Sequence, residues 1–313
     1  MSEKPAPTTD IITLHFNKPQ LTANCIEKCL GISDEWRHMW IVDNGSDEAF
    51  AYAGAHSERI TVLRSADNLG FSGGVNLGLQ QVGAGPAQAA LLLNNDAHPE
   101  RGYIRACESM AAAQPHLWAC VGIGCAPASE GSGNPIPIEA PQPMTRVAPY
   151  FPAKWAPDDD YPTEPFQVDW VTGAAMWLSR TAWEAVGPWD EVFFLYCEDV
   201  DYGYRIRQAG GQVWCIPKIH YFHARNASSD AQLGLVYYYA FRGFFRFFQK
   251  HNLIRLFGLF RWALSKSGQE NPHHLYLRRS AMWDWMFNRM GPVRPKRLQK
   301  LQRAAAQYTV QKD

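Results

Sequence analysis

Short apolar segments that end in polar residues alternate with helical segments along the N-terminal third of the chain, and this alternation constrains the fold most. The pattern predicts strands at 10–17, 38–46 with its closing turn, 60–63 and 89–93, and helices at 21–30 and from the glycine-rich 68–76 to about 82. Such alternation favours a largely parallel sheet with helices on both faces. We therefore expect an α/β fold.

Polar residues follow the expected strands at the point where each strand ends. They include Asn17, Asp43, Asn68 and Asp96, and Phe16 stands beside the first of them. In open parallel sheets, ligands bind beyond the carboxyl ends of the strands. We therefore expect these residues to converge on one edge and to line a pocket.

Three carboxylates lie within four residues at Glu198, Asp199 and Asp201, after Phe194 and Tyr196. Acidic residues are favoured in the first turn of a helix by its dipole, so the cluster could be a charged helix start and nothing more. A catalytic or binding site is the other interpretation, because clustered carboxylates perturb one another's pKa.

Composition limits the class of protein. The 313 residues allow one large domain or a core with an appendage, and the seven cysteines include no C-x-x-C pair. The first ten residues are polar and no apolar run reaches about 18 residues, so we expect a cytosolic protein with reduced thiols and no membrane span. The net charge is zero, but residues 242–303 hold fourteen Lys and Arg against two acids. The acidic remainder argues against nucleic-acid binding.

Residues 126–161 are rich in Pro, Ser, Gly and Ala, which is typical of a long loop that serves as a lid or a binding loop. The pattern resumes with a glycine-containing strand at 168–178 and a short helix at 180–186. The role of the long loop stays open.

Six motifs in order resemble family 2 glycosyltransferases, and among them the bacterial rhamnosyltransferase-type enzymes of cell-surface polysaccharide synthesis. The motifs are Val42–Ser46, Asn68–Asn76, Leu93–Asp96, Val171–Ala174, Phe194–Gly210, and His223 followed by Ser228 and Ser229. The resemblance runs from about residue 10 to 245. It implies a GT-A type catalytic domain over 1–235, with a basic, aromatic helical region over 236–313.

The resemblance implies a nucleotide-diphospho-sugar site. It assigns the donor contacts to Leu14, Phe16, Asp43, Asn68, Gly73, Asn76, Asn94 and Asn95. A carboxylate such as Asp43 can accept hydrogen bonds from a base or a ribose, although it can equally close the turn that follows it. The glycine-rich turn around Gly73 could likewise be purely structural.

The resemblance also implies a divalent metal, Mn²⁺ or Mg²⁺, held by Asp96 and His223. Asn94 stands where many relatives have a second aspartate, so this site brings one negative charge where they bring two, and a strand-ending cap is the alternative. An imidazole ligand favours Mn²⁺. His220 is the competing histidine and is expected on the opposite side of a strand.

The reaction that the resemblance implies is inverting glycosyl transfer. Asp199 would be the base and Glu198 would orient the acceptor or Asp199. Acceptor contacts are assigned to Trp189, Tyr196, Asp201 and Arg242. Core packing explains the aromatic residues equally well, and helix capping is the alternative role for Asp201.

In the C-terminal region, apolar and cationic residues interleave at helical spacing, as at 237–250, 256–262 and 282–286. Such helices lie on anionic membranes, which suits a lipid-linked or glycan acceptor and a peripheral position on the inner face of the cytoplasmic membrane. Packing onto the core or onto a second subunit is the alternative. The resemblance favours dTDP-L-rhamnose, with UDP-sugars next. A nucleotidyltransferase and a non-catalytic sugar-binding or membrane-scaffold protein are the rival functions, and the oligomeric state is open.

Overall fold

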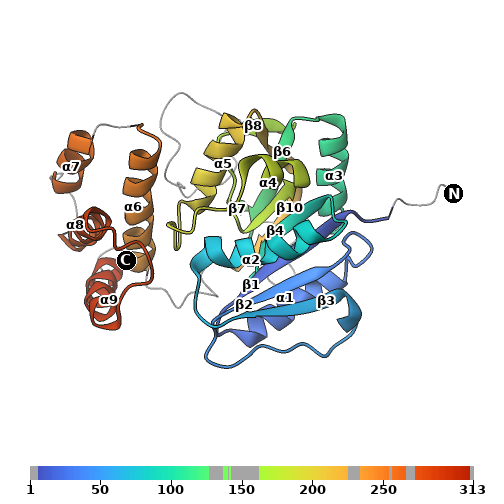
Figure 1. Ribbon diagram of the computed structural model, residues 1–313, viewed down its shortest axis with the longest axis horizontal. Helices are drawn as coiled ribbons and strands as arrows, with labels where there is room; N and C mark the ends of the chain where they lie inside the picture. The colour runs from blue at the N-terminus through green and yellow to red at the C-terminus, as the bar shows by residue number, and fades with distance from the viewer. Residues whose placement is uncertain are drawn as a thin grey trace.

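The structure is a computed structural model that describes residues 6–126, 137–139, 141, 162–224, 233–253, 256–265 and 272–310. Most of the long loop expected at 126–161 therefore lies outside the described residues, as do Ser228 and Ser229. The described chain forms one mixed sheet covered by helices, with a group of C-terminal helices beside it (Figure 1).

The N-terminal half of the sheet is parallel, as the sequence predicts. Strands β1 (Thr9–His15), β2 (Met39–Asn44), β3 (Ile60–Ser65) and β4 (Ala89–Asn94) pair in parallel in the order β3-β2-β1-β4. Nearly every side chain of β1, β2 and β4 is buried, because helices cover both faces.

The other half of the sheet differs from the expected pattern. The expected strand at 168–178 is two strands, β8 (Phe166–Val168) and β9 (Ala175–Ser179), and β9 runs antiparallel between β4 and β6 (Leu117–Cys125). β10 (Gln212–His223) pairs in parallel with β6 and antiparallel with β5 (Ala97–Pro99) and β8. β7 (Pro137–Glu139) pairs with the end of β6.

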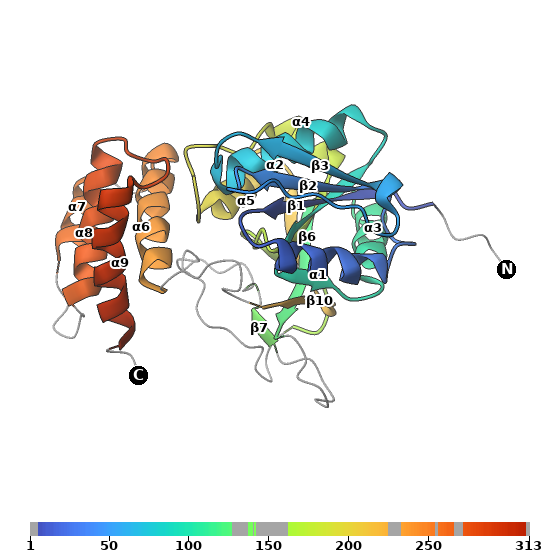
Figure 2. The ribbon, with the colours of Figure 1, turned by 90° about the horizontal axis from the view of Figure 1, so that it is seen from below.

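Helices cover the two faces of the sheet (Figure 2). α1 (Pro19–Leu30) and α3 (Tyr103–Ala113) share one face, where Arg105 of α3 pairs with Asp34 just beyond α1 at 2.7 Å. α2 (Gly70–Ala84) and α4 (Arg180–Val186) cover the other, and α5 (Glu198–Gln208) packs beside α4 against β10. A 3-10 turn, η1 (Ser57–Arg59), precedes β3. The helix expected at 180–186 is confirmed.

The C-terminal helices are α6 (Leu233–Lys250), α7 (Leu256–Leu264), α8 (Pro272–Met286) and α9 (Pro295–Val310). They enclose a second apolar cluster, which includes Tyr238, Phe245 and Trp285. Phe193 and Val200 also belong to this cluster, so the helices share a core with the acidic segment that precedes them. Among the described residues, no helix is both long and apolar enough to cross a bilayer.

Candidate active site

The carboxyl ends of β1, β2 and β4 bring the predicted donor residues together. In the sheet register His15 lies opposite Asp43, and Leu14 lies opposite Asn94. Phe16, one residue past β1, is 44% exposed, which is unusual for a phenylalanine beside a core strand. The register therefore brings Asp43 and Asn94 to the same edge as the end of β1, and the pocket expected there stays a prediction.

Asp43 is fully buried, and the chain itself uses its carboxylate. The backbone amides of Ser46 and Phe50 donate to it at 3.1 and 3.0 Å, and Arg64 Nη1 lies 2.6 Å from Oδ2. Burial alone would raise the pKa of Asp43. The hydrogen bonds from Ser46 and Phe50 and the charge of Arg64 lower it by more, so the pKa lies below its usual value. The turn-closing role is thus realised, and the donor role stays a prediction.

Asn68 and Asn44 shape the turn that begins α2. Asn68 Oδ1 accepts from the Gly70 amide at 2.9 Å, and Asn44 donates to the Gly70 carbonyl at 2.9 Å. Gly70 has φ +73°, and a Cβ there would lie 2.3 Å from the Phe194 carbonyl oxygen, so the turn requires glycine. The glycine-rich turn therefore joins the strand-end site to the segment that leads into the acidic cluster.

Gly73 and Asn76 lie on α2 beside that same segment. Asn76 accepts from the Trp189 amide at 2.8 Å and donates to the Trp189 carbonyl and to Glu191. A Cβ on Gly73 would lie 2.7 Å from that of Leu69. Asn76 thus holds residues 189–191 in place, and this structural contact is a different role from the predicted donor contact.

Asp96 and His223 lie side by side after β4 and at the end of β10. His223 Nε2 is 3.2 Å from Asp96 Oδ1, and the Ala224 amide donates to the Asp96 carbonyl at 2.9 Å. His220, in contrast, has both its amide and its Nδ1 on Glu100, at 2.7 and 3.1 Å. Of the two candidate histidines, His223 is therefore the one that accompanies Asp96.

The donor set at Asp96 suits part of a divalent metal shell. One carboxylate and one imidazole favour Mn²⁺ over Mg²⁺, and further positions would fall to water and phosphate oxygens. Within the described chain, no group of three or more His, Cys, Asp or Glu gathers as a metal site. Asn95, which the sequence places in the donor site, instead donates to Thr22 at 3.0 Å, and Asn94 is half-buried.

Two left-handed residues aim the acidic pair at the start of α5. Tyr196 and Cys197 have φ of 66° and 69°, and Glu198 and Asp199 follow directly as the first helical residues. Non-glycine residues pay about 1 kcal/mol or more each for this conformation. The backbone before the helix is therefore strained, and this strained turn sets the direction in which the two carboxylates leave the chain.

Negative charges cluster around Tyr196. Burial, followed by the charges of Glu198, Asp199 and Asp96, raises the pKa of the Tyr196 phenol, so these carboxylates lie near enough to influence it. Burial and then the Asp199 charge raise the pKa of Glu198 well above its usual value, which favours its neutral form. Glu198 Oε2 is buried with no hydrogen-bond partner among the described residues.

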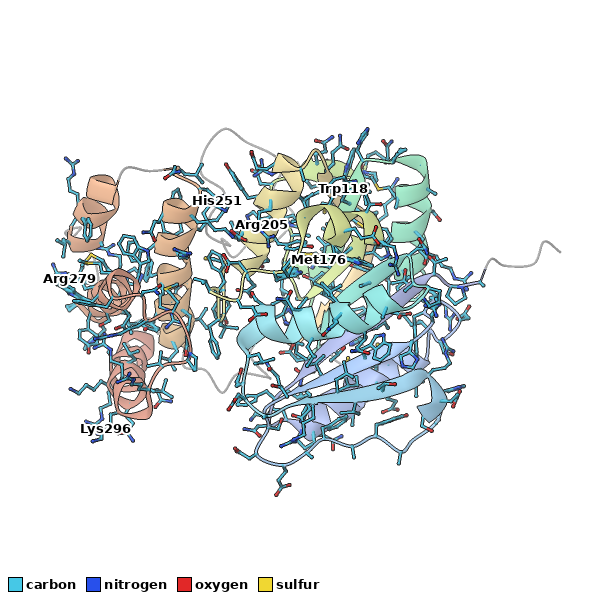
Figure 3. The ribbon with its side chains drawn as sticks, viewed as in Figure 1. Trp118, Met176, Arg205, His251, Arg279 and Lys296 are labelled. Atoms are coloured by element: carbon cyan, nitrogen blue, oxygen red, sulfur yellow. The ribbon has the colours of Figure 1, made fainter. Side chains whose placement is uncertain are left out.

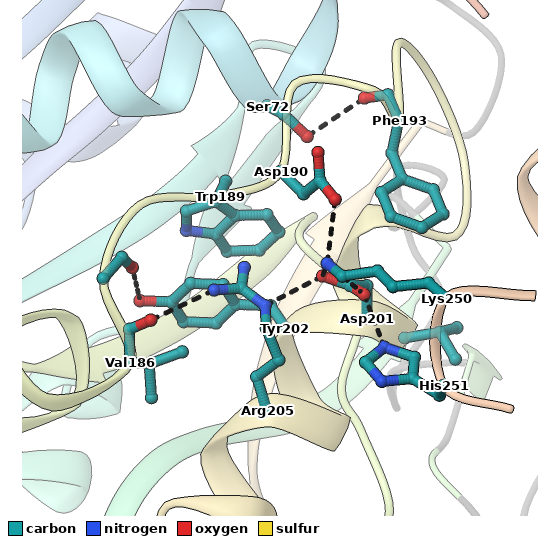
Figure 4. Close-up of polar contacts among 12 residues, drawn as sticks. Ser72, Val186, Trp189, Asp190, Phe193, Asp201, Tyr202, Arg205, Lys250 and His251 are labelled. Atoms are coloured by element: carbon teal, nitrogen blue, oxygen red, sulfur yellow. Dashed lines mark hydrogen bonds and ion pairs between the residues drawn. The ribbon is translucent and has the colours of Figure 1, made fainter. Parts of the chain in front are cut away.

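Asp201 belongs to a separate ion-pair cluster (Figure 4). Its carboxylate is fully buried and contacts Arg205 Nε at 2.9 Å, Lys250 Nζ at 2.8 Å and His251 Nε2 at 2.7 Å. Lys250 also pairs with Asp190 at 2.8 Å. The predicted acceptor contact does not fit this placement, because the side chain is enclosed by its partners. The alternative role predicted for Asp201, as the cap of the helix, is wrong too, since Cys197 is the N-cap residue of α5.

Trp189 and Arg242 are also corrected. Trp189 is 1% exposed and stacks on Tyr202 with ring centroids 4.3 Å apart. Arg242 is 2% exposed, donates to the Arg289 carbonyl at 3.0 Å and lies over the Tyr239 ring. Both side chains pack in the interior, where an acceptor sugar cannot contact them directly. Of the four predicted acceptor residues, Tyr196 is the one that lies at the acidic pair.

Helix α6 holds the strained turn from behind. Cys197 Sγ donates to the Ala240 carbonyl at 3.4 Å, and the Phe194 and Tyr239 rings lie 6.1 Å apart. A Cβ on Gly243 would lie 2.6 Å from the Tyr196 carbonyl oxygen, so only a glycine allows this approach. Gly243 was not among the residues predicted from the sequence, because its role depends on a close approach between two distant segments.

The mixed sheet, with carboxylates at its strand ends and an acidic pair opening a nearby helix, is an architecture of the GT-A type. Its fold is similar to that of a crystallised protein, GalNAc-T7 with UDP, GalNAc and Mn²⁺, at a TM-score of 0.59 and 10% identity over 91% of this chain and 57% of that one. This likeness shows the fold.

Residues 10–137 match the family described as Glycosyl transferase family 2. The chain is 25% identical, over 67% of its length and 66% of the relative's, to the low-salt glycan biosynthesis hexosyltransferase Agl10 of Haloferax volcanii. It is 26% identical, over 60% and 67%, to the N-acetylglucosaminyl-diphospho-decaprenol L-rhamnosyltransferase of Mycobacterium tuberculosis. The chain thus spans about two thirds of these relatives. Residues 10–137 are thus similar to glycosyl transferase family 2, and these similarities support a glycosyltransferase that resembles rhamnosyltransferases.

Proposed function

We propose that this protein is a divalent-metal-dependent, inverting glycosyltransferase that moves a sugar, with L-rhamnose favoured, from a nucleotide diphosphate to a hydroxyl of a glycan or lipid-linked acceptor. The observation that carries the proposal is the contact of His223 Nε2 with Asp96 Oδ1 at 3.2 Å, close to the acidic pair Glu198 and Asp199 that opens α5. A reaction that removes one proton and releases a diphosphate needs both a base and a site for anionic charge.

Asp199 is the base in this proposal. Burial and the neighbouring Asp199 charge raise the pKa of Glu198 and favour its neutral form, so we assign the base to Asp199 and not to Glu198. Its oxygen takes the proton of the acceptor hydroxyl while that hydroxyl oxygen bonds to the anomeric carbon and the carbon–phosphate-oxygen bond breaks. Glu198 orients the acceptor or Asp199, and Tyr196 offers its ring to the sugar.

Asp96 and His223 would hold the metal, which supplies positive charge to the departing diphosphate. Asp43, Phe16 and the Asn68 turn would surround the nucleotide, since they share the edge where β1 and β2 end. The rhamnosyltransferase relative supports dTDP-L-rhamnose as the donor and a lipid-linked acceptor, with UDP-sugars as the next candidates. The basic C-terminal helices support a peripheral position on the cytoplasmic membrane. A catalytic domain over 1–235 stays part of the proposal.

Calorimetry tests the proposal directly. We would titrate dTDP-rhamnose, UDP-glucose, UDP-galactose, UDP-galactofuranose and NAD into the wild-type protein and Asp96→Ala, each with and without Mn²⁺. We expect Mn²⁺-dependent binding of one nucleotide sugar that Asp96→Ala weakens at least tenfold. Binding of no sugar, or of NAD alone, would overturn the proposal.

A further inference from the structure

Helix α8 presents an apolar face that no other described element covers. Tyr276, Trp283, Met286 and Phe287, at or directly after the helix, are 40, 48, 42 and 60% exposed, and Arg279 lies among them. Their spacing of three and four residues puts them on one side of the helix. We call these five residues the α8 outer face. The opposite side, with Leu277, Ala281 and Trp285, packs in the second apolar cluster.

The charge on and around this face is positive. Arg279 donates to the Leu264 carbonyl at the end of α7, and the Arg289 guanidinium lies 5.2 Å from the centre of the Phe287 ring. The other exposed cations of the described C-terminal helices and their connections are Arg261, Arg294, Lys296, Lys300 and Arg303. The acidic residue in the described part of these helices, Asp284, is buried and pairs with Arg297 at 3.2 Å and with Arg289 at 3.6 Å. When Arg294 is counted, three cations therefore surround or follow it for one negative charge.

This charge pattern decides between two occupants. A second copy of the chain would bring Arg279 and Arg289 against their own equivalents in a two-fold contact, with no exposed acid in the described α7–α9 to pair them. An anionic bilayer attracts the same cations, and Trp, Tyr and Phe rings are favoured at the headgroup level. Arg279 lies on the side of the helices away from the sheet, so docking there leaves the strand-end site uncovered (Figure 3).

We propose that the α8 outer face docks on the surface of an anionic lipid bilayer. The inference deepens the peripheral membrane position in the proposed function, because it names the surface and the lipid charge that it requires. The rings would enter the interface side by side, since Trp283 and Phe287 stack with centroids 6.1 Å apart.

Co-sedimentation of the full chain with vesicles tests the inference. We expect binding to phosphatidylcholine vesicles that contain 30% phosphatidylglycerol, weaker binding to pure phosphatidylcholine, and loss in 0.5 M NaCl. Trp283→Ser with Phe287→Ser should weaken binding at least tenfold, and Arg279→Gln with Arg289→Gln severalfold. Arg101→Gln with Lys218→Gln is the matched control, since it removes two exposed cations from the sheet domain and should leave binding unchanged.

Three outcomes would overturn the inference: no binding of wild-type protein to anionic vesicles, equal binding of the Trp283/Phe287 variant, or equal loss in the control. A wild-type dimer that the Trp283/Phe287 variant dissolves, without vesicle binding, would assign the face to a second copy. Donor calorimetry and thermal melts on the same variants separate the two proposals. If a variant keeps donor binding but loses vesicle binding, the result concerns only the α8 outer face. If the protein binds vesicles but no donor, the result counts only against the glycosyl-transfer proposal.

Discussion

The first turn of α5 carries two kinds of buried acid within four residues. Asp201 is enclosed by the cations Arg205 and Lys250 and by His251, whereas the charges that shift the pKa of Glu198 and Tyr196 are mainly other carboxylates. A paired carboxylate ties elements together, and a carboxylate among other carboxylates is held ready for a proton or a cation. The sequence motif looks like one acidic cluster, but the structure divides it into Asp201, which lies in an ion-pair cluster, and the Glu198–Asp199 pair, for which we propose the chemical role.

Asp199→Asn should have the largest effect and should act on chemistry alone. We expect kcat to fall about 10²- to 10⁴-fold, because the base is lost, with donor affinity and melting temperature unchanged. Radiolabelled sugar transfer, donor calorimetry and a thermal melt measure the three quantities. If donor binding is lost along with transfer, Asp199 belongs to the donor site and the proposed division fails.

Asp201→Asn is the matched variant one helical step away, and it should act on stability. Breaking a buried ion pair costs about 3 kcal/mol or more, and 1 kcal/mol corresponds to a shift of about 2–4 °C in melting temperature for domains of 150–250 residues. We therefore expect a lower melting temperature, with transfer per folded molecule reduced far less than in Asp199→Asn. If Asp201→Asn reduced transfer as much as Asp199→Asn does and left the melting temperature unchanged, the distinction between the two kinds of acid would be wrong.

Gly243→Ala tests whether α6 positions the acidic pair. The added methyl would meet the Tyr196 carbonyl, and overpacking of this kind costs about 1–3 kcal/mol. We expect kcat to fall about tenfold at unchanged donor affinity, because the turn before Glu198 must shift. Gly83→Ala, in α2 with its nearest neighbour 3.8 Å away, is the control and should be neutral or stabilising. Equal kcat in both variants would remove the positioning role.

Of the four variants, Glu198→Gln should have the smallest effect, and that effect should be on the pH dependence of stability. The folded pKa of Glu198 is raised, so its favourable contribution is complete below the unfolded pKa and is lost as pH rises through the folded pKa. Glutamine cannot ionise, so the variant should match the wild type in acid and exceed its melting temperature by a few degrees at alkaline pH. Melting curves across the pH range measure this difference, and parallel profiles would show that Glu198 is not a buried acid.

The sequence predicted the features that depend on local pattern. The parallel strands, the polar strand ends and the α4 helix follow from periodicity and turn residues. The antiparallel β9 could not be predicted, since strand order depends on contacts between distant segments. Trp189 and Arg242 were misassigned for the same reason, because the packing that buries them comes from elements far away in sequence. The sequence could not decide between His220 and His223 as the partner of Asp96, because the decision depends on the contact of His220 with the distant Glu100.

Helix α6 contacts both the strained Tyr196–Cys197 turn and helix α8, so the acidic pair and the helix that carries the α8 outer face share one neighbour. Thermodynamic linkage makes any effect between two such sites reciprocal. If binding of a surface to α8 raises the affinity for the acceptor by a given factor through the geometry of the turn, binding of the acceptor raises the affinity for that surface by the same factor. The enzyme would then remain longest where its acceptor is most abundant.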